Sequence, residues 1–186
     1  NVHLWDYSNP EAAAQKLIAH GRTVNSVAYL PDGSKLVSAG VDGTIRQWEL
    51  TNAGQEPRIL SGHQGGIHSI ALSGDRSALA QLASAGDDGT IRLWDPTNPT
   101  DTPLLLIRDL PVSDIAFSEG GDKLAAGTND GRLLLWDPQT PESQPEIVDG
   151  ANKGLITSIV FSPDGNTLVS ARDDGAIILR DTSDIA

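Results

Sequence analysis

A single pattern recurs along the chain at intervals of a little over forty residues, and this repeat constrains the fold more than any other feature. The four tryptophans mark the repeat at separations of 43, 46 and 42 residues: Trp5, Trp48, Trp94 and Trp136. Arg180 occupies the next marker position, a further 44 residues along. This spacing is typical of a repeated supersecondary unit.

Each copy contains an apolar strand, a turn, a second strand, an Asp-Gly turn and a third strand with the marker position. The four copies are VNSVAYLPDGSKLVSAGVDGTIRQWEL, IHSIALSGDRSALAQLASAGDDGTIRLWD, VSDIAFSEGGDKLAAGTNDGRLLLWD and ITSIVFSPDGNTLVSARDDGAIILRD. Asp-Gly suits a tight turn whose residues need positive φ, so each copy is expected to be an antiparallel meander. A fourth strand is expected in the linkers between copies, which read AQKLIAH, PRILSGH, TPLLLIRDL and PEIVDGA.

Four antiparallel strands per repeat are typical of one blade of a β-propeller. We therefore predict an all-β chain of four-stranded antiparallel blades, with four repeats plus a partial blade. All of residues 1–186 would belong to one propeller, with repeats at approximately 1–6 (partial), 15–50, 57–95, 103–137 and 146–181. Three extra residues lie between Ile70 and Ser84, so the first hairpin of the second repeat is expected to protrude or to contain a bulge.

The predicted ring is incomplete. Four blades and a partial one leave strand edges that a folded protein must cover. We expect ring closure by further blades in the same chain or by a second chain. The chain begins at Asn1 and contains no Met, which we interpret as a fragment or a processed chain.

Composition excludes several classes of function. The net charge of −12 repels phosphate backbones and anionic membrane surfaces, so neither nucleic acid nor a membrane is an expected partner. No apolar run reaches the roughly 20 residues that a membrane-spanning helix needs. Without Cys there is no disulfide, thiolate metal site or cysteine nucleophile. This leaves the compartment open, and we expect a cytoplasmic one.

The segments Gly62-His63, SAGDDGTIRLWD and FSPDGNTLVSARDDG resemble the WD-repeat β-propeller family, and the resemblance covers nearly the whole chain. It implies that a His before the first strand, a Ser or Thr on the second, the turn Asp and the Trp form a hydrogen-bonded tetrad in each blade. Two repeats match completely, with His20, Ser38, Asp42 and Trp48 in one, and His63, Ser84, Asp88 and Trp94 in the next.

The later repeats depart from this tetrad and keep only Asp130 and Trp136 in the third, and Ser170 and Asp174 in the fourth. The other positions hold Arg108, Ala126, Asn152 and Arg180. We expect these two blades to be held together less tightly, unless Arg180 finds an acidic partner.

Ser, His and Asp are also the members of a serine hydrolase triad. We interpret them as structural, because the set recurs in two adjacent repeats and no nucleophile elbow or oxyanion loop accompanies it. Polar groups buried between blades must satisfy one another. We therefore predict no catalytic residues and no enzymatic activity.

Other candidate sites have simpler explanations. Asp87-Asp88 and Asp173-Asp174 resemble catalytic carboxylate pairs, but neighbours in a tight turn point apart, whereas glycosidase carboxylates face each other. His63 and His68 could share a metal ion, yet no third ligand stands at a suitable spacing. We predict neither a metal site nor a cofactor.

A propeller presents the loops that enter its inner strands on one broad face, and this face is the expected binding surface. By resemblance to the family, the candidate partner-binding residues flank the start of each first strand and precede each turn Asp. They are Thr23, Asn25, Val41, Gly66, His68, Asp87, Pro111, Ser113, Asn129, Leu155, Thr157 and Asp173. This set lacks the aromatic and Arg anchors that usually concentrate binding energy, so it does not identify a partner.

The leading hypothesis is a non-catalytic protein–protein interaction scaffold. The resemblance implies that it is the propeller portion of a larger signalling, regulatory or multi-subunit protein. One alternative is a purely structural subunit of a large assembly. A less favoured one is a propeller that binds a ligand or works as an enzyme in its central channel, because the four innermost strands offer only Asp114 and His68 for such chemistry.

Overall fold

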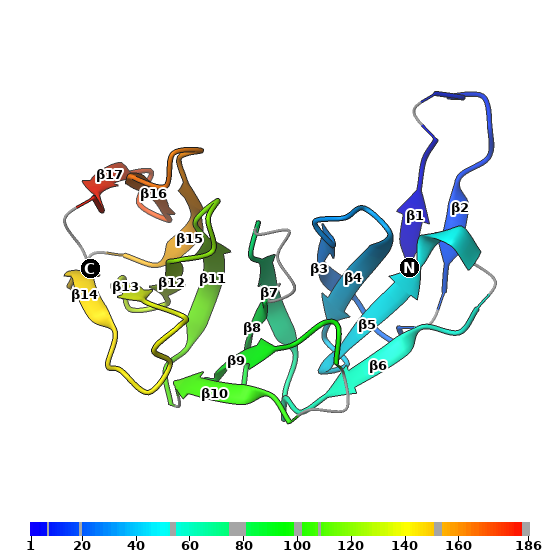
Figure 1. Cartoon of the computed structure of the whole chain (residues 1–186). Helices are drawn as coiled ribbons and strands as arrows, with labels where there is room; N and C mark the ends of the chain where they lie inside the picture. Colours follow the sequence, from blue (N-terminus) through cyan, green and yellow to red (C-terminus); the bar gives the residue numbers. More distant parts are fainter. Residues whose placement is uncertain are drawn as a thin grey trace.

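Apart from one short 3-10 turn, every regular element in the described part of the chain is a β-strand. The computed structural model describes residues 1–6, 8–18, 20–52, 55–74, 81–98, 102–107, 109–150 and 154–183. The strands form five antiparallel sheets that follow one another along an arc (Figure 1). Within the described ranges the 3-10 turn Leu50–Asn52 is the only helical element, and it is far too short to cross a bilayer. The predicted all-β fold is confirmed.

Three sheets are complete four-stranded blades. Blade I contains β3 (Val24–Tyr29), β4 (Lys35–Gly40), β5 (Thr44–Glu49) and β6 (Arg58–Ser61). Blade II contains β7 (Ile67–Leu72), β8 (Leu82–Gly86), β9 (Ile91–Trp94) and β10 (Leu104–Ile107). Blade III contains β11 (Val112–Phe117), β12 (Leu124–Thr128), β13 (Leu133–Trp136) and β14 (Glu146–Asp149).

The two remaining sheets are smaller. Blade IV has three strands, β15 (Ile156–Phe161), β16 (Thr167–Arg172) and β17 (Ile177–Asp181). The partial blade has two, β1 (Val2–Leu4) and β2 (Gln15–Leu17). The arc therefore does not close into a ring, as the incomplete-ring prediction states.

The outer strand of each complete blade comes from the linker that follows its third strand. β6 pairs antiparallel with β5, with Ser61 opposite Thr44, and β10 and β14 pair in the same way with β9 and β13. The linker strand β2 likewise pairs with β1 and not with β3. Strands that follow each other in sequence thus remain neighbours in the sheet. As a result, a blade is displaced by one strand from the sequence repeat, and each repeat contributes strands to two adjacent sheets.

The apolar core lies in layers between neighbouring blades. Ile45 and Leu60 of blade I are buried against Ile67 and Leu82 of blade II. Successive side chains of a strand point to opposite faces of its sheet. On β12, accordingly, Ala126 packs in the layer toward blade II, and its neighbour Ala125 packs in the layer toward blade IV.

The innermost strands β3, β7, β11 and β15 lie on the concave side of the arc (Figure 1). Hydrogen bonds join each of them to the next. In each bond a side-chain oxygen of one strand accepts the backbone N–H of an isoleucine on the following one. The pairs are Ser26 with Ile70 at 3.4 Å, Ser69 with Ile115 at 3.4 Å and Asp114 with Ile159 at 2.8 Å.

Apolar side chains are uncovered at both ends of the arc. On blade IV, Val160, Ile177 and Leu179 are exposed, and Ile177 reaches 69% exposure. At the other end, Tyr29 is exposed and Trp5 reaches 71% exposure. Between blades the corresponding positions are covered by the neighbouring sheet, so the two ends have the character of unfinished interfaces.

The extra residues of the second repeat fall in the hairpin between β7 and β8. Its strands pair up to Leu72 and Leu82, and the Ser73 N–H closes the ladder on the Gln81 carbonyl at 2.9 Å. The tip, residues 75–80, lies outside the described residues. The protrusion or bulge expected there therefore stays a prediction.

Candidate functional site

The four tetrad residues of the first matching repeat meet in blade I. His20 precedes β3, and its Nδ1 lies 2.9 Å from the nearer carboxylate oxygen of Asp42, in the turn between β4 and β5. Its Nε2 lies 2.8 Å from the Ser38 Oγ. The Trp48 indole N–H donates to the same hydroxyl at 2.9 Å. The network thus ties the loop before the innermost strand to the second and third strands of the blade, β4 and β5, and to the turn between them.

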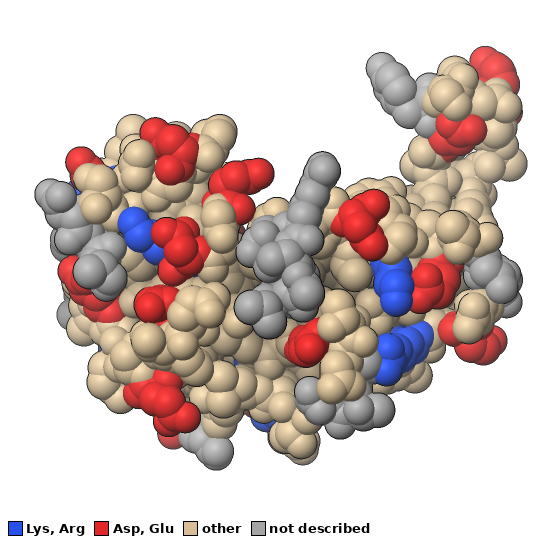
Figure 2. Space-filling view, in the orientation of Figure 1, with Lys and Arg blue, Asp and Glu red and all other residues tan. Residues whose placement is uncertain are grey.

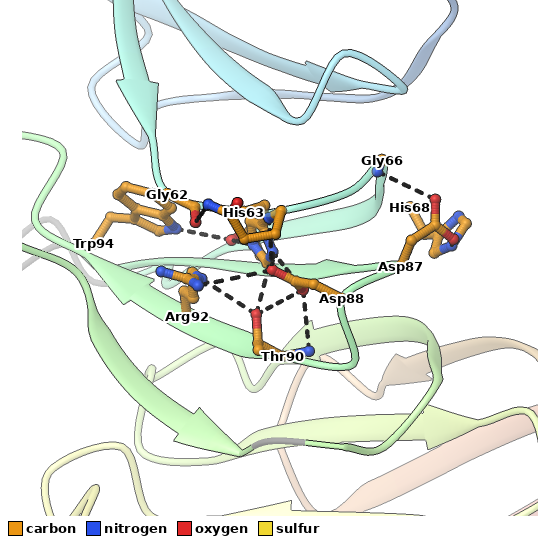
Figure 3. A network of polar contacts seen from close by, with 11 residues as sticks. Gly62, His63, Gly66, His68, Asp87, Asp88, Thr90, Arg92 and Trp94 are labelled. Carbon is orange, nitrogen blue, oxygen red and sulfur yellow. Dashed lines mark hydrogen bonds and ion pairs between the residues drawn. The ribbon is translucent and has the colours of Figure 1, made fainter.

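Blade II contains the same network (Figure 3). His63 Nδ1 lies 2.9 Å from Asp88, His63 Nε2 lies 2.7 Å from the Ser84 Oγ, and Trp94 Nε1 donates to that oxygen at 2.8 Å. A carboxylate only accepts hydrogen bonds, so the His63 proton must be on Nδ1. The indole N–H therefore donates to the hydroxyl, the hydroxyl donates to the imidazole Nε2, and the imidazole Nδ1–H donates to the carboxylate. Each group is satisfied, and the histidine is neutral.

The protonation states of this network follow from burial and hydrogen bonding. Burial acts to raise the pKa of Asp88, but the hydrogen bonds that its carboxylate accepts outweigh this and lower the pKa to about 2. The pKa of Asp42 is lowered to about 2 by the same balance. Burial lowers the pKa of His63, although the neighbouring Asp88 opposes the shift. A carboxylate and a neutral imidazole are therefore the stable forms near neutral pH.

The geometry of the tetrad does not suit nucleophilic catalysis. Ser38 and Ser84 are completely buried, and each hydroxyl bonds both an indole and an imidazole. A nucleophile must reach a substrate carbonyl, and these oxygens reach only their own blade. The arrangement can hold a loop against a sheet, which is a structural task.

Blade III lacks the centre of the network. Ala126 stands where the other blades have Ser, and the buried Trp136 indole N–H has no hydrogen-bond partner within the described residues. Asp130 instead bonds the Arg132 guanidinium, with its nearer nitrogen at 2.5 Å, and the Thr128 hydroxyl at 2.5 Å. Arg108, at the His position, lies outside the described residues. The turn of blade III is thus held by local contacts and not by the tetrad.

Blade IV replaces the tetrad by charged groups, of which only Arg180 was considered from the sequence. Arg180, in the Trp position, reaches Asp149 of β14 at 3.3 Å, so it does find an acidic partner. Arg172, at the end of β16, reaches the same carboxylate at 2.9 Å, and both members of this pair are buried. Arg172 also donates to the Gly131 carbonyl of blade III at 3.3 Å. Ion pairs between blades III and IV thus supply contacts that the tetrad supplies elsewhere.

The remaining tetrad positions of blade IV are only locally bonded. Asp174 is exposed and accepts the Ala176 N–H at 2.9 Å. The Ser170 hydroxyl is buried without a hydrogen-bond partner within the described residues. Asn152, at the His position, lies outside the described residues. The sequence signal for the ion pair with Asp149 was Arg172 itself, because it stands where the first two repeats have Gly40 and Gly86.

The predicted binding residues lie at one end of the blades, which we call the entry face: the loops that enter the inner strands and the turns between second and third strands. Nine of the twelve residues are exposed there: Thr23, Asn25, Val41, His68, Asp87, Pro111, Asn129, Thr157 and Asp173. Ser113 and Leu155 are half-buried. Gly66 is buried, which corrects its expected exposure: a Cβ there would stand 2.8 Å from the Asp87 carboxylate.

A β-bulge near the start of each innermost strand shapes this face. The register of each strand shifts over three residues, and the middle residues are Asn25, His68, Ser113 and Thr157. Bulges re-aim side chains at the ends of sheets. Asn25 donates to the Ile67 carbonyl of the next blade at 2.8 Å, and Ser113 donates to the Ile156 carbonyl. Thr157 donates to the Ala171 carbonyl at 3.3 Å.

His68 is the exception among the bulge residues. Its Nε2 lies 2.6 Å from the Asp87 carboxylate, which also accepts the Gly66 N–H at 3.1 Å (Figure 3). Both side chains are exposed, at 44% and 56%. Asp88 points the other way, into the tetrad, so the two neighbouring carboxylates do point apart (Figure 3). His68 and Asp87 thus form an oriented polar pair that faces solvent.

The two histidines that could share a metal ion, His63 and His68, bond different partners. His63 is enclosed by Asp88 and Ser84, whereas His68 bonds Asp87. Across the described ranges, no group of three or more His, Asp or Glu side chains is placed to hold a metal ion. The structure therefore gives no ligand set to which a metal site could be assigned.

Comparison with known proteins identifies the repeat. Four segments match the WD40 family model (WD domain, G-beta repeat): residues 13–49, 54–95, 107–137 and 144–181. WD repeat and SOCS box-containing protein 1 of Homo sapiens is 35% identical over 82 residues, which cover 44% of this chain and 19% of that protein. Small ribosomal subunit protein RACK1y of Oryza sativa subsp. japonica is 37% identical over 76 residues, or 41% of this chain and 22% of that protein.

WD repeat-containing protein 1 of Xenopus tropicalis is 41% identical over 63 residues, which cover 32% of this chain and 10% of that protein. The matched segments thus span about a fifth of the curated relatives' length or less. The family model, in contrast, matches most of the chain, and its four segments each end on or just after the third strand of a sheet. The chain belongs to the WD40 repeat family.

Proposed function

We propose that this chain is a non-catalytic scaffold that binds protein partners through its entry face. WD40 repeats are generally interaction modules, and the family match supports this class of function. The observation that carries the proposal is the set of four bulges, which project side chains from the innermost strands at one end of a rigid stack of blades. Binding surfaces are commonly built from loops that a rigid scaffold holds in place.

Within this face, the proposal gives the leading role to His68 and Asp87. Asn25, Ser113 and Thr157 bond backbone carbonyls of the propeller itself. Among the described residues, the side chains of His68 and Asp87 bond each other and the Gly66 N–H, and both are about half exposed, so their outer edges are available to a partner. Oriented polar groups of this kind give specificity at an interface.

We also propose that the scaffold is the propeller portion of a larger signalling, regulatory or multi-subunit protein. One relative joins WD repeats to a SOCS box, and another is a small ribosomal subunit protein, as their names state. The lack of Cys is compatible with a reducing compartment, and we propose a cytoplasmic location. Imaging of a fluorescently tagged full-length protein tests the location, and a secreted or organellar signal would contradict it.

The uncovered ends of the arc favour a second candidate role, that of a structural subunit. Ile177 and Leu179 on blade IV and Trp5 on the partial blade are apolar and exposed. We propose that further blades, from the same chain or from a second chain, cover these ends. The native mass of the source protein separates the two routes, because a second chain would double or otherwise increase the mass beyond one polypeptide.

Site-specific photo-crosslinking tests the entry face directly. A photoreactive amino acid is placed at Thr23 or Asn129, both exposed on the entry face, and at Ile147, which is exposed on the outer strand β14. We expect the entry-face positions to yield the same crosslinked protein and the outer position to yield none. His68→Ala should then weaken this crosslink more than Asn25→Ala does. Equal labelling from the outer strand would contradict the proposal.

A further inference from the structure

The face opposite the entry face is strongly acidic. We call it the exit face, and it consists of the turns between first and second strands together with the connections from third to fourth strands. Figure 2 looks onto this face, where carboxylates lie over every blade and basic groups are few. On blade III alone it carries Glu119 and Asp122 in the first turn, and Asp137 and Glu142 in the connection. Lys123 is the nearby basic group.

A cavity opens in this acidic surface on blade III. Its volume is about 750 Å³, and it lies between the first turn, the end of β13 and the connection that leads to β14. The volume falls within the range of roughly 300–1,000 Å³ that is usual for ligand pockets. The cavity is therefore large enough to admit a long side chain together with part of the backbone that carries it.

The lining combines carboxylates with apolar groups. Asp122, Asp137 and Glu146 contribute acidic groups, and Leu135 and Trp136 contribute apolar ones. Asp122 is held by the Ser118 hydroxyl at 2.6 Å, and Asp137 by the Gln139 N–H at 2.8 Å. Two of the three carboxylates are thus fixed in position before any ligand arrives.

The one ammonium group in the lining does not cancel this charge. Lys123 Nζ donates to the Thr182 carbonyl at 2.5 Å, which directs it toward blade IV. Glu146, at the start of β14, is exposed, and its carboxylate has no hydrogen bond or ion pair within the described residues. The cavity therefore keeps an excess of negative charge, with one carboxylate still unbonded.

We propose that this cavity binds an arginine-bearing segment of a partner protein. A guanidinium is always charged, binds carboxylates through two parallel hydrogen bonds and is weakly hydrated. Its aliphatic stem packs on apolar side chains while the charged end meets acidic groups. Nucleic acid does not fit, because the same carboxylates repel phosphate. The inference goes beyond the proposed function, because it concerns the other face of the propeller.

A labelled peptide tests the proposal on the full chain. The probe is a fluorescein-tagged peptide of alternating Gly and Arg, titrated by fluorescence anisotropy at low ionic strength, with a Gly and Glu peptide as the reference. We expect the arginine peptide to bind and the glutamate peptide not to bind. A lysine peptide of equal length should bind about threefold more weakly or worse, because an ammonium cannot make the paired contacts. Equal binding of the lysine peptide would overturn the preference for arginine.

Matched variants locate the binding. Asp122→Asn with Glu146→Gln removes two charges from the cavity, and Asp87→Asn with Asp173→Asn removes two from the entry face. The first pair should weaken arginine-peptide binding at least about fivefold and the second less than about twofold. Equal losses would show a general attraction to an acidic protein and overturn the site, as would absence of binding to the unaltered chain.

A second variant guards against loss of folding in the first. Glu146→Lys reverses one charge at an exposed strand end and leaves the bond between Asp122 and Ser118 in place. It should abolish peptide binding with an unchanged melting temperature. Retained binding would overturn the proposal. Crosslinking from the entry face is unaffected by this variant, so failure here and failure of the proposed function can be told apart.

Discussion

Replacement of Asp88 by alanine is the sharpest test of the tetrad as a structural element. The carboxylate accepts hydrogen bonds from His63 Nδ1 at 2.9 Å, from the Thr90 hydroxyl at 2.7 Å and from the Gln64 N–H at 2.9 Å. Its side chain is 9% exposed and that of His63 is completely buried. Asp88→Ala therefore removes the nearest acceptor of the imidazole N–H in a site that excludes most water, and leaves it the Thr90 hydroxyl oxygen at 3.2 Å. The Thr90 hydroxyl loses its own acceptor at the same time.

Two estimates of the same hydrogen bonds give the magnitude. A buried donor left unsatisfied costs about 1–3 kcal/mol. The pKa of Asp88 falls from 3.8 to about 2 on folding, and such a shift corresponds to about 2 kcal/mol of stabilisation of the ionised carboxylate. The two estimates agree, so we expect the free energy of unfolding to fall by about 2 kcal/mol, which lowers the melting temperature by about 4–8 °C in a chain of this size.

Urea titration, followed by tryptophan fluorescence and circular dichroism, measures the loss. The matched control is Asp174→Ala, the same change at the same turn position of blade IV, where the carboxylate is exposed and bonds the Ala176 N–H. The control should lose less than about 0.5 kcal/mol. Equal losses in the two variants, or an unchanged midpoint for Asp88→Ala, would refute the reasoning.

Three further predictions follow from the same contacts. Folding lowers the pKa of both tetrad aspartates from 3.8 to about 2, so their contribution to stability is complete above about pH 5 and declines as the pH falls toward 2. Urea midpoints measured across this range should fall as the pH falls, and a flat profile would exclude the effect. Ala126→Ser offers the Trp136 indole N–H an acceptor and should raise the unfolding free energy by about 1 kcal/mol. Ala125→Ser, on the other face of β12, should lower the unfolding free energy, and thermal melts of the two variants test this difference. Arg172→Met should lower the unfolding free energy by about 3 kcal/mol, because it removes the buried partner of Asp149. Addition of Asp149→Leu should recover part of this loss, and a double-mutant cycle without coupling would count against the ion pair.

The repeat could be predicted from sequence because its signals are local. A tight turn needs particular residues at adjacent positions, and Asp42-Gly43 places glycine at a φ of 73°. The spacing of such turns and of the tryptophans then defines the strands between them. The two complete tetrads were predicted through the resemblance to the WD-repeat family, whose four tetrad positions recur in the first two repeats.

The one-strand offset between the sequence repeat and the blade could not be predicted from local sequence signals. β6 pairs with β5, the strand that precedes it, and this choice of sheet edge is a tertiary contact that no turn motif within the repeat specifies. An acidic partner was considered for Arg180 without identification of Asp149, and no role was predicted for Arg172. These partners lie in different blades, so no spacing within one repeat connects them.

The amino-acid sequence by itself determined the strands and their turns, because these depend on residues close along the chain, and its resemblance to the WD-repeat family predicted the two complete tetrads. Only the tertiary structure decided that Arg172 and Asp149 form a buried pair between blades, that His68 faces solvent beside Asp87, and that acidic turns surround a cavity on the exit face. These features arise where separate repeats stack. Stacking brings together residues that are far apart along the chain, and no local sequence pattern specifies which of them will be in contact.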